Sequence, residues 1–206
     1  MAKAQLLLVL VPFLSLLPAH LALNQDFCVA DLNRISASVT ADDFHYRGLA
    51  TAAPSVAPYG TGVAFAFAEQ FPGLNALGIS ATRFDVAPGG VVGLHTHPHG
   101  SEIILILEGS LSVGVVSANA NTVYTKANVG KGELFVIPQG LLHFLYNGGD
   151  TAAVAFAAYS SDNAGLQFVD YALFKNDSLP AGVVEKATFL DEAEVRRLKA
   201  LFGGSG

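Results

Sequence analysis

The chain has 206 residues and a formal net charge of −6, and 51% of its residues are hydrophobic while only 14% are charged. Average domains carry about 25% charged residues, so this chain should bury a large core or a large subunit interface. A nucleic-acid-binding protein is expected to be basic, so the acidic balance argues against that class.

The chain begins with the pattern of a secretory signal peptide. Lys3 gives a positive start, an apolar run covers residues 6–17, and small residues lie around Ala19 and Ala22. A membrane-spanning helix needs about 20 apolar residues and rarely carries prolines, which this stretch contains. We therefore predict that residues 1–23 are cleaved, and that the mature protein is secreted without a membrane anchor.

Secretion normally permits disulfides, but Cys28 is the single cysteine of the chain. No bridge can therefore form within one chain, and Cys28 is either free or paired with another chain. The simplest role for this side chain is that of a small buried hydrophobic group.

The middle of the chain reads as a series of strands. The 21 glycines and 9 prolines predict many turns. Short apolar runs alternate with these turns, and Ile103–Gly109 is continuous enough to be a strand buried on both faces. The runs are Ile79–Ala87, Ile103–Gly109, Leu111–Val116, Thr122–Lys126, Glu133–Pro138, Leu141–Asn147 and Ala152–Ser160. They predict an all-β sandwich or barrel over residues 63–160, preceded by an N-terminal arm over residues 24–62.

Helical patterns occupy the C-terminal extension, residues 161–206. Gly165–Phe174 has helix-like spacing, and Asp191–Gly204 is amphipathic, with Asp191 as cap and Glu194 completing a capping box. One face is apolar (Val195, Leu198, Leu201, Phe202) and the other polar (Glu192, Arg196, Arg197, Lys199). The apolar face must pack either on its own barrel or on a neighbouring subunit, and the pattern does not choose between them.

The stretch GLHTHPHGSE, residues 93–102, holds three of the six histidines and a glutamate. His95 and His97 are two apart, so on a strand they share one face. A turn after them can return Glu102 to the same point, and His143 lies in another predicted strand. Three imidazoles and one carboxylate suit Mn, Fe, Zn or Ni, so we predict a metal site.

His99 is expected to lie outside this set. It sits between Pro98 and Gly100 in the turn, which should rotate its ring away from the pair. We therefore predict that His99 is at the surface or beside the site, and is not a ligand.

These residues resemble the two motifs of the cupin superfamily. Gly89, His95, His97, Glu102 and Gly109 fit the first motif, and Gly132, Pro138, Gly140, His143 and Asn147 fit the second. The resemblance is closer to plant germin-like proteins and covers essentially the whole mature chain, notably Gln25–Leu32, Pro72–Ser80, Phe84–Gly90 and Phe135–Phe144.

The resemblance implies a single cupin jelly-roll β-barrel with C-terminal α-helices that clasp neighbours in a homo-hexamer, a trimer of dimers. It implies a manganese ion, with iron or zinc as alternatives, held by His95, His97, Glu102 and His143. Family members are secreted to the apoplast and cell wall. Their activities include superoxide dismutation and oxalate oxidation, and some are described as auxin-binding or receptor-like.

Two departures from the family pattern carry information. Tyr46 stands where the family usually has the cysteine that pairs with the one at Cys28, so that bridge is absent. Oxalate-oxidising germins use two asparagines near the metal; one matches Asn75, whereas the other position holds Val92. Valine cannot donate a hydrogen bond to a carboxylate, which makes oxalate oxidation the less favoured activity.

The expected function is superoxide dismutation that produces hydrogen peroxide. The main alternative is a non-catalytic wall-associated protein that binds a ligand such as auxin. Asn75, Val92 and Phe144 are the substrate-pocket candidates, with Leu142 and Leu145 beside Phe144 as further walls. Asn176 begins an N-x-S sequence and is a candidate glycosylation site.

Overall fold

The computed structural model describes residues 39–205. The predicted signal peptide, Cys28 and the germin-like stretch Gln25–Leu32 therefore lie outside the described residues.

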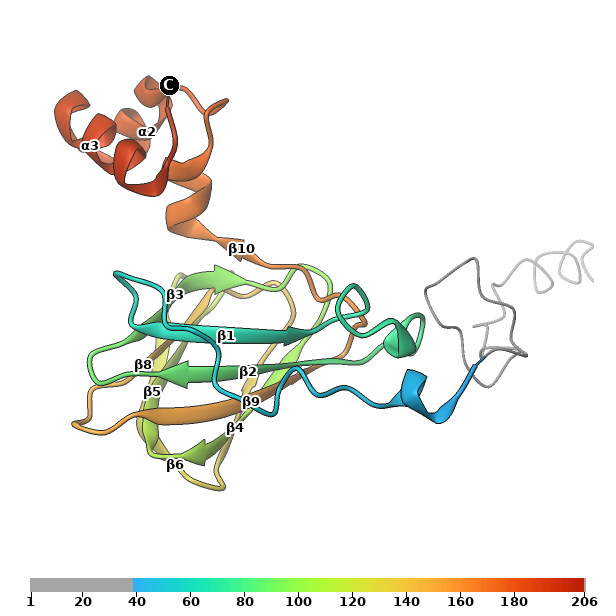
Figure 1. Ribbon diagram of the computed structural model, residues 1–206. Helices are drawn as coiled ribbons and strands as arrows, with labels where there is room; N and C mark the ends of the chain where they lie inside the picture. Colours follow the sequence, from blue (N-terminus) through green and yellow to red (C-terminus); the bar gives the residue numbers. More distant parts are fainter. Residues whose placement is uncertain (1–38, 206) are drawn as a thin grey trace, which may run out of the picture.

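Two antiparallel five-stranded sheets face each other and enclose the core (Figure 1). The first sheet has the order β1-β2-β9-β4-β7, and the second has the order β10-β3-β8-β5-β6. The strands are β1 Thr61–Ala66, β2 Ser80–Val86, β3 Val91–Thr96, β4 Glu102–Glu108, β5 Ser110–Val116, β6 Val123–Gly130, β7 Leu134–Ile137, β8 His143–Tyr146, β9 Ala153–Tyr159 and β10 Gln167–Phe168. Each of the seven predicted runs overlaps a strand, so the predicted all-β fold is confirmed.

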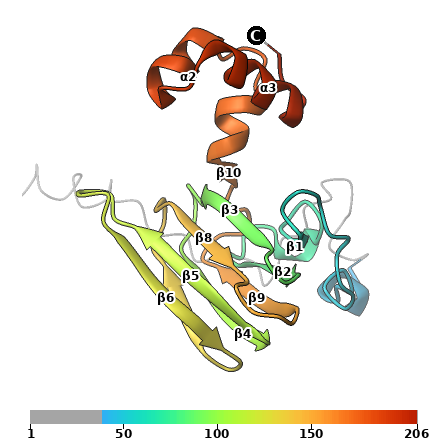
Figure 2. The ribbon, with the colours of Figure 1, turned by 90° about the vertical axis from the view of Figure 1, so that its left-hand side faces the viewer.

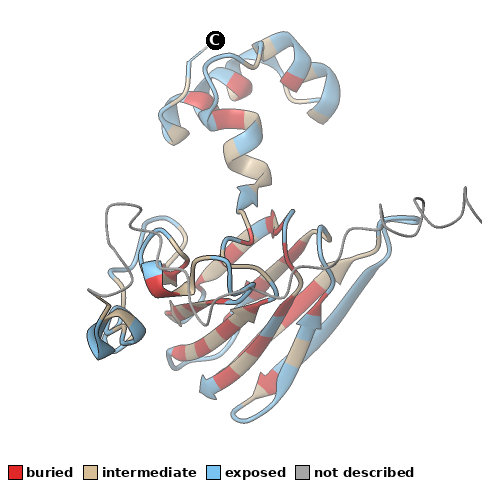
Figure 3. Ribbon diagram, turned by 90° about the vertical axis from the view of Figure 1, so that its right-hand side faces the viewer, coloured by how far each residue is buried: buried red, intermediate tan, exposed pale blue. Residues whose placement is uncertain are grey.

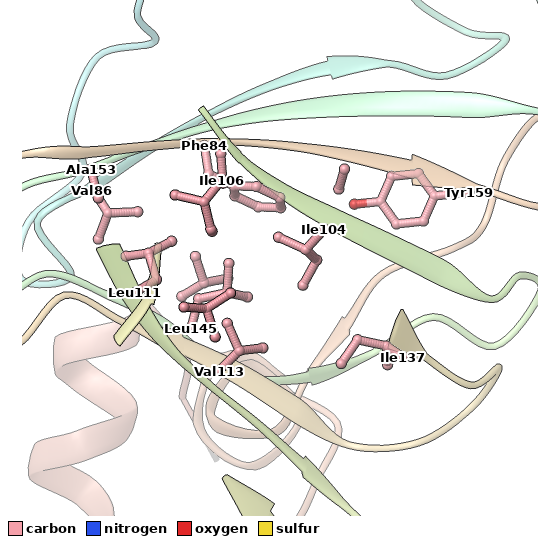
Figure 4. Packing of buried hydrophobic residues seen from close by; sticks show 14 of the residues in the cluster. Phe84, Val86, Ile104, Ile106, Leu111, Val113, Ile137, Leu145, Ala153 and Tyr159 are labelled. Carbon is pink, nitrogen blue, oxygen red and sulfur yellow. The ribbon is translucent and has the colours of Figure 1, made fainter. Parts of the chain in front are cut away.

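Alternation along the strands builds the core. In β2 and β9 every second residue is buried, which gives the banded pattern of Figure 3. The inward side chains meet between the sheets, where Ile104, Ile106 and Leu145 are fully buried (Figure 4). Fully burying such a side chain contributes about 1.5–3 kcal/mol, so the two facing layers hold the barrel together.

Strand β4 differs from its prediction. Its apolar run was expected to be buried on both faces, but burial alternates along it, and Ile103 is 48% exposed. The neighbouring strand β7 exposes Leu134 (63%) and Val136 (60%) on the same sheet. The expectation is wrong within residues 39–205 because none of them forms a second layer over the outer face of this sheet.

The C-terminal extension stands away from the barrel (Figures 1 and 2). It contains η4 Tyr171–Lys175, α2 Ala181–Thr188 and α3 Glu192–Phe202, and short helical turns η2 Ala41–Phe44 and η3 Pro72–Leu74 precede the barrel strands β1 and β2 respectively. The prediction of a helix over Gly165–Phe174 is wrong in its first half, because Gln167 and Phe168 pair with Thr96 and His95 as strand β10. Within residues 39–205, no helix is both long and apolar enough to cross a membrane.

Helix α3 confirms the predicted cap but corrects the predicted polar face. The Asp191 carboxylate accepts from the Glu194 amide at 2.8 Å, while the Glu194 side chain pairs with Arg197 instead of closing a capping box. Lys199, predicted to be solvated, is only 1% exposed. Its Nζ donates to three carbonyl oxygens, those of Asn176, Leu179 and Ser205, at 2.9–3.1 Å.

Lys199 is expected to hold the helical extension together. The substitution Lys199→Met keeps the stem but leaves the three carbonyls without this donor, and should destabilise the extension by about 1–3 kcal/mol. Amide hydrogen exchange along α3 would measure the loss. Lys186→Met, at an exposed position of α2, is the matched control, and equal protection in the two variants would contradict this role.

Tyr46 anchors the segment before the barrel. Its hydroxyl donates to the Phe65 carbonyl in β1 at 2.8 Å, and its ring stacks on Phe71 at 5.2 Å. The ring also lies over Gly48, where a Cβ would come within 2.2 Å of the tyrosine oxygen. At the position of the missing cysteine, the chain therefore uses stacking and a hydrogen bond.

Candidate metal centre

The four predicted ligands converge inside the barrel. His95 lies in β3, His97 follows the end of β3, Glu102 opens β4 and His143 opens β8. One ligand atom from each lies within 4.8 Å of the others, and all four residues are buried. Because β4 belongs to one sheet and β3 and β8 to the other, the site joins both layers.

A local irregularity in β3 aims the first histidines inward. His95 pairs with His143 across the strands, and the register shifts between Val92 and His95. Strict alternation would place Val92 and His95, which are three apart, on opposite faces of the sheet. Both residues are nevertheless buried. The shift therefore turns His95 inward, and His97 shares its orientation, as the two-residue spacing predicted.

Hydrogen bonds fix the tautomer of each histidine. The Nδ1 atoms of His95, His97 and His143 lie 2.7–2.9 Å from the carbonyl oxygens of Gly93, Gly165 and Leu141. A carbonyl oxygen only accepts, so each Nδ1 must carry the proton. Each Nε2 is then left with a free lone pair, which is how proteins prepare a histidine for a metal.

The facing atoms have no partner among the described residues. The Nε2 atoms of His97 and His143 and both carboxylate oxygens of Glu102 are buried without a hydrogen bond. The Nε2 of His143 lies 3.0 Å from Glu102 Oε2, and that of His97 lies 3.5 Å from it.

Burial lowers the pKa of His95 and of His97, so both rings are neutral at physiological pH. Unpaired acceptors packed this closely are costly in an apolar interior, and a cation would stabilise them. The donor set thus fits a divalent metal.

A cavity of about 320 Å³ opens beside the histidines. Apart from His95, His97 and a few hydroxyl groups its wall is apolar, and Val92 is part of it. It is lined by Ala53, Pro54, Val56, Tyr59, Thr61, Val63, Phe65, Phe84, Val91, Val92, Gly93, His95, His97, Tyr159, Leu166, Phe168 and Tyr171.

Two other pocket candidates lie elsewhere. Phe144 follows His143 in β8, so its side chain points to the opposite face of the sheet, where the ring covers Gly114. Asn75 ends the turn η3 and is not among the residues that line the cavity. His99 is exposed in its turn, as expected for a histidine outside the cluster.

Sequence reasoning missed the tyrosines around the site. Tyr159 at the end of β9 is 3% exposed, its ring lies 4.7 Å from that of His97, and burial followed by the Glu102 charge raises its pKa. Tyr59 donates to Asp170 across the cavity wall. The alternation of Ala152–Ser160 could have placed Tyr159 inside, whereas nothing in the sequence pairs Tyr59 with Asp170.

Comparisons with known proteins agree with the fold and the motifs. Residues 47–196 match the cupin family. The chain is 51% identical to germin-like protein 8-14 of Oryza sativa subsp. japonica, over the full length of both, and 46% identical to the auxin-binding protein ABP19a of Prunus persica, over 94% of this chain and 96% of that one. A solved structure of oxalate oxidase matches with a TM-score of 0.82 and 35% identity, over 87% of this chain and 96% of that chain. The chain is therefore a member of the germin-like proteins, within the cupin family.

Proposed function

We propose that this protein binds manganese through His95, His97, Glu102 and His143 and dismutates superoxide to oxygen and hydrogen peroxide. The observation that carries the proposal is the buried convergence of three imidazole Nε2 atoms and one carboxylate, with each Nδ1 proton already committed to a carbonyl. Bound manganese would supply one-electron redox chemistry, which zinc in the same ligands could not.

The residues of the chain would do the remaining work. Glu102 contributes the one negative charge of the ligand set, which favours the higher oxidation state of the metal. His95 and His97 stay neutral because burial lowers their pKa. The apolar cavity wall limits water near the site and thereby influences its redox potential.

Metal analysis and activity together test this proposal. The mature chain, purified from a secreting host, should contain manganese and should dismutate superoxide in a rate assay that scales with the manganese content. A folded sample that holds only zinc, or manganese without dismutation, would refute the dismutase assignment.

A second candidate is the binding of an auxin-like ligand without catalysis. It is favoured by the cavity, whose 320 Å³ of mostly apolar space is far larger than superoxide requires. The Prunus persica relatives named as auxin-binding proteins point the same way. Tight auxin binding by a manganese-loaded sample with no dismutation would favour this candidate.

Oxalate oxidation is less favoured. The structural neighbours named as oxalate oxidases share 35% identity with this chain. However, the described residues that line the cavity include Val92 but no asparagine or glutamine. Hydrogen peroxide release on adding oxalate would reverse this order.

The mature protein is secreted to the apoplast and cell wall, which the N-terminal pattern of residues 1–23 supports. A homo-hexamer, built as a trimer of dimers, is supported by the exposed apolar face of β4 and β7 and by the extension, where Phe189 is 94% exposed. Asn176 is exposed and therefore open to glycosylation.

A further inference from the structure

Tyr159 brings a hydroxyl group to the metal ligands from the sheet that carries Glu102, which faces the sheet of His95 and His143. It is paired across the first sheet with Glu102 on one side and with Ser80 on the other. Its ring lies 4.7 Å from the His97 ring and forms part of the cavity wall. Figure 4 shows the hydroxyl pointing into the barrel.

The bond from Thr82 leaves the Tyr159 proton free to be donated, and the Glu102 carboxylate is one competing acceptor for it. Thr82, which is fully buried in β2, donates its hydroxyl hydrogen to the Tyr159 oxygen at 2.5 Å. Tyr159 is the acceptor in that bond, so its own hydrogen can be given to another oxygen atom. Accepting one hydrogen bond also strengthens the donation of the next.

A third hydroxyl lies in the same row. Ser80 is 5% exposed, and its Oγ has no hydrogen-bond partner within the described part of the chain. Buried hydroxyl groups without acceptors cost free energy in an apolar core. Thr82 has its acceptor in Tyr159, so two buried hydroxyls, those of Ser80 and Tyr159, still have a hydrogen to donate, which points to an oxygen-bearing ligand.

The charges around the cavity define the ligand class. Lysine and arginine are both missing from the described lining, so no side chain there would neutralise an anion. The metal ion of the proposed function would supply the neutralising charge, and hydroxyl groups would then orient the ligand. A small oxyanion fits the metal ion and the hydroxyl groups alike. Its negative charge binds the metal, and its oxygen atoms accept hydrogen bonds from the hydroxyls.

We propose that the Tyr159 hydroxyl, held by Thr82, donates a hydrogen bond to an oxygen atom of a small oxyanion bound at the metal centre, and so makes the site selective for such anions. This inference rests on the metal site of the proposed function, but it does not depend on dismutase activity. Tyr159 is thus assigned as a ligand-binding residue beside the four that hold the metal.

Anion titration of the manganese-loaded mature protein tests the assignment. Formate is the probe, and its binding is followed through the electron paramagnetic resonance spectrum of Mn(II). Tyr159→Phe should weaken formate binding about tenfold, because one hydrogen bond to a charged ligand is lost. Thr82→Val removes only the hydrogen bond that holds the Tyr159 hydroxyl, and should weaken formate binding by roughly threefold.

Tyr146→Phe is the matched control, since it makes the same change in β8 at a residue that does not line the cavity. It should leave formate binding within about twofold of the wild type and confirm that the loss is local. Thermal unfolding and manganese content are measured for every variant, to show that the fold and the metal are retained.

Three results would overturn the assignment. Tyr159→Phe could bind formate as the wild type does, or Tyr146→Phe could weaken binding equally. Tyr159→Phe could also reduce manganese affinity without changing formate affinity per bound ion, in which case the hydroxyl serves Glu102. A wild-type protein that binds manganese and formate but does not dismutate superoxide would refute the proposed activity alone.

Discussion

Replacing His143 with alanine is expected to reduce manganese affinity by at least about 100-fold, so that the purified variant carries almost no metal. His143 is fully buried, and its Nε2 lies 3.0 Å from the Glu102 carboxylate. Removing the imidazole takes away one ligand. The ion would then have no ligand from β8, the strand that pairs with β3 at His95. Elemental analysis of the secreted protein and calorimetric titration with Mn(II) would measure both effects.

The chain offers a matched control for this change within the same motif. His99 is exposed and lies two residues from His97, so His99→Ala should retain the manganese content of the wild type. Equal metal content in the His143→Ala and wild-type proteins would show that the convergence does not hold the ion. Circular dichroism of both variants would confirm that the barrel is still folded.

Exchanging manganese for zinc is expected to abolish dismutation while keeping the structure. Zinc accepts the same imidazole and carboxylate ligands but does not change oxidation state. We therefore expect the zinc-loaded protein to lose superoxide dismutation to the uncatalysed background, while its melting temperature stays above that of the metal-free protein. Stopped-flow superoxide decay and thermal unfolding of the three samples would show both.

Reloading the zinc protein with manganese should restore the rate, which separates loss of redox chemistry from damage to the protein. Substantial dismutation by a sample shown to contain only zinc would mean that the activity does not come from this centre. In that case the auxin-like ligand of the second candidate becomes the better account of the cavity.

The sequence predicted the strands and the ligand cluster because both depend on local periodicity. Alternation in Ala152–Ser160 gave β9, and the two-residue spacing of His95 and His97 gave their common face. The turn that returns Glu102 also follows from short-range residue types. The predictions of these features hold because burial of one face of a strand fixes its register, and the register decides which side chains point inward.

The features that sequence reasoning missed depend on contacts between distant segments. Gln167 and Phe168 form β10 only because the edge of β3 offers unpaired backbone groups, which outweighs their helical spacing. Lys199 is buried because three carbonyls from two separate segments, the η4–α2 loop and the residues after α3, meet at its amine. Phe144 was misplaced because the alternation that points His143 inward turns its neighbour outward.

The way Tyr46 holds the arm has a consequence for redox tolerance. An attachment made of ring stacking on Phe71 and a bond to the Phe65 carbonyl contains no sulfur. Thiol reductants and shifts in extracellular glutathione therefore cannot release it, and peroxide cannot remake it in the wrong pairing. If the protein produces hydrogen peroxide, as proposed, the Tyr46 attachment would stay intact at any ratio of thiols to disulfides around it.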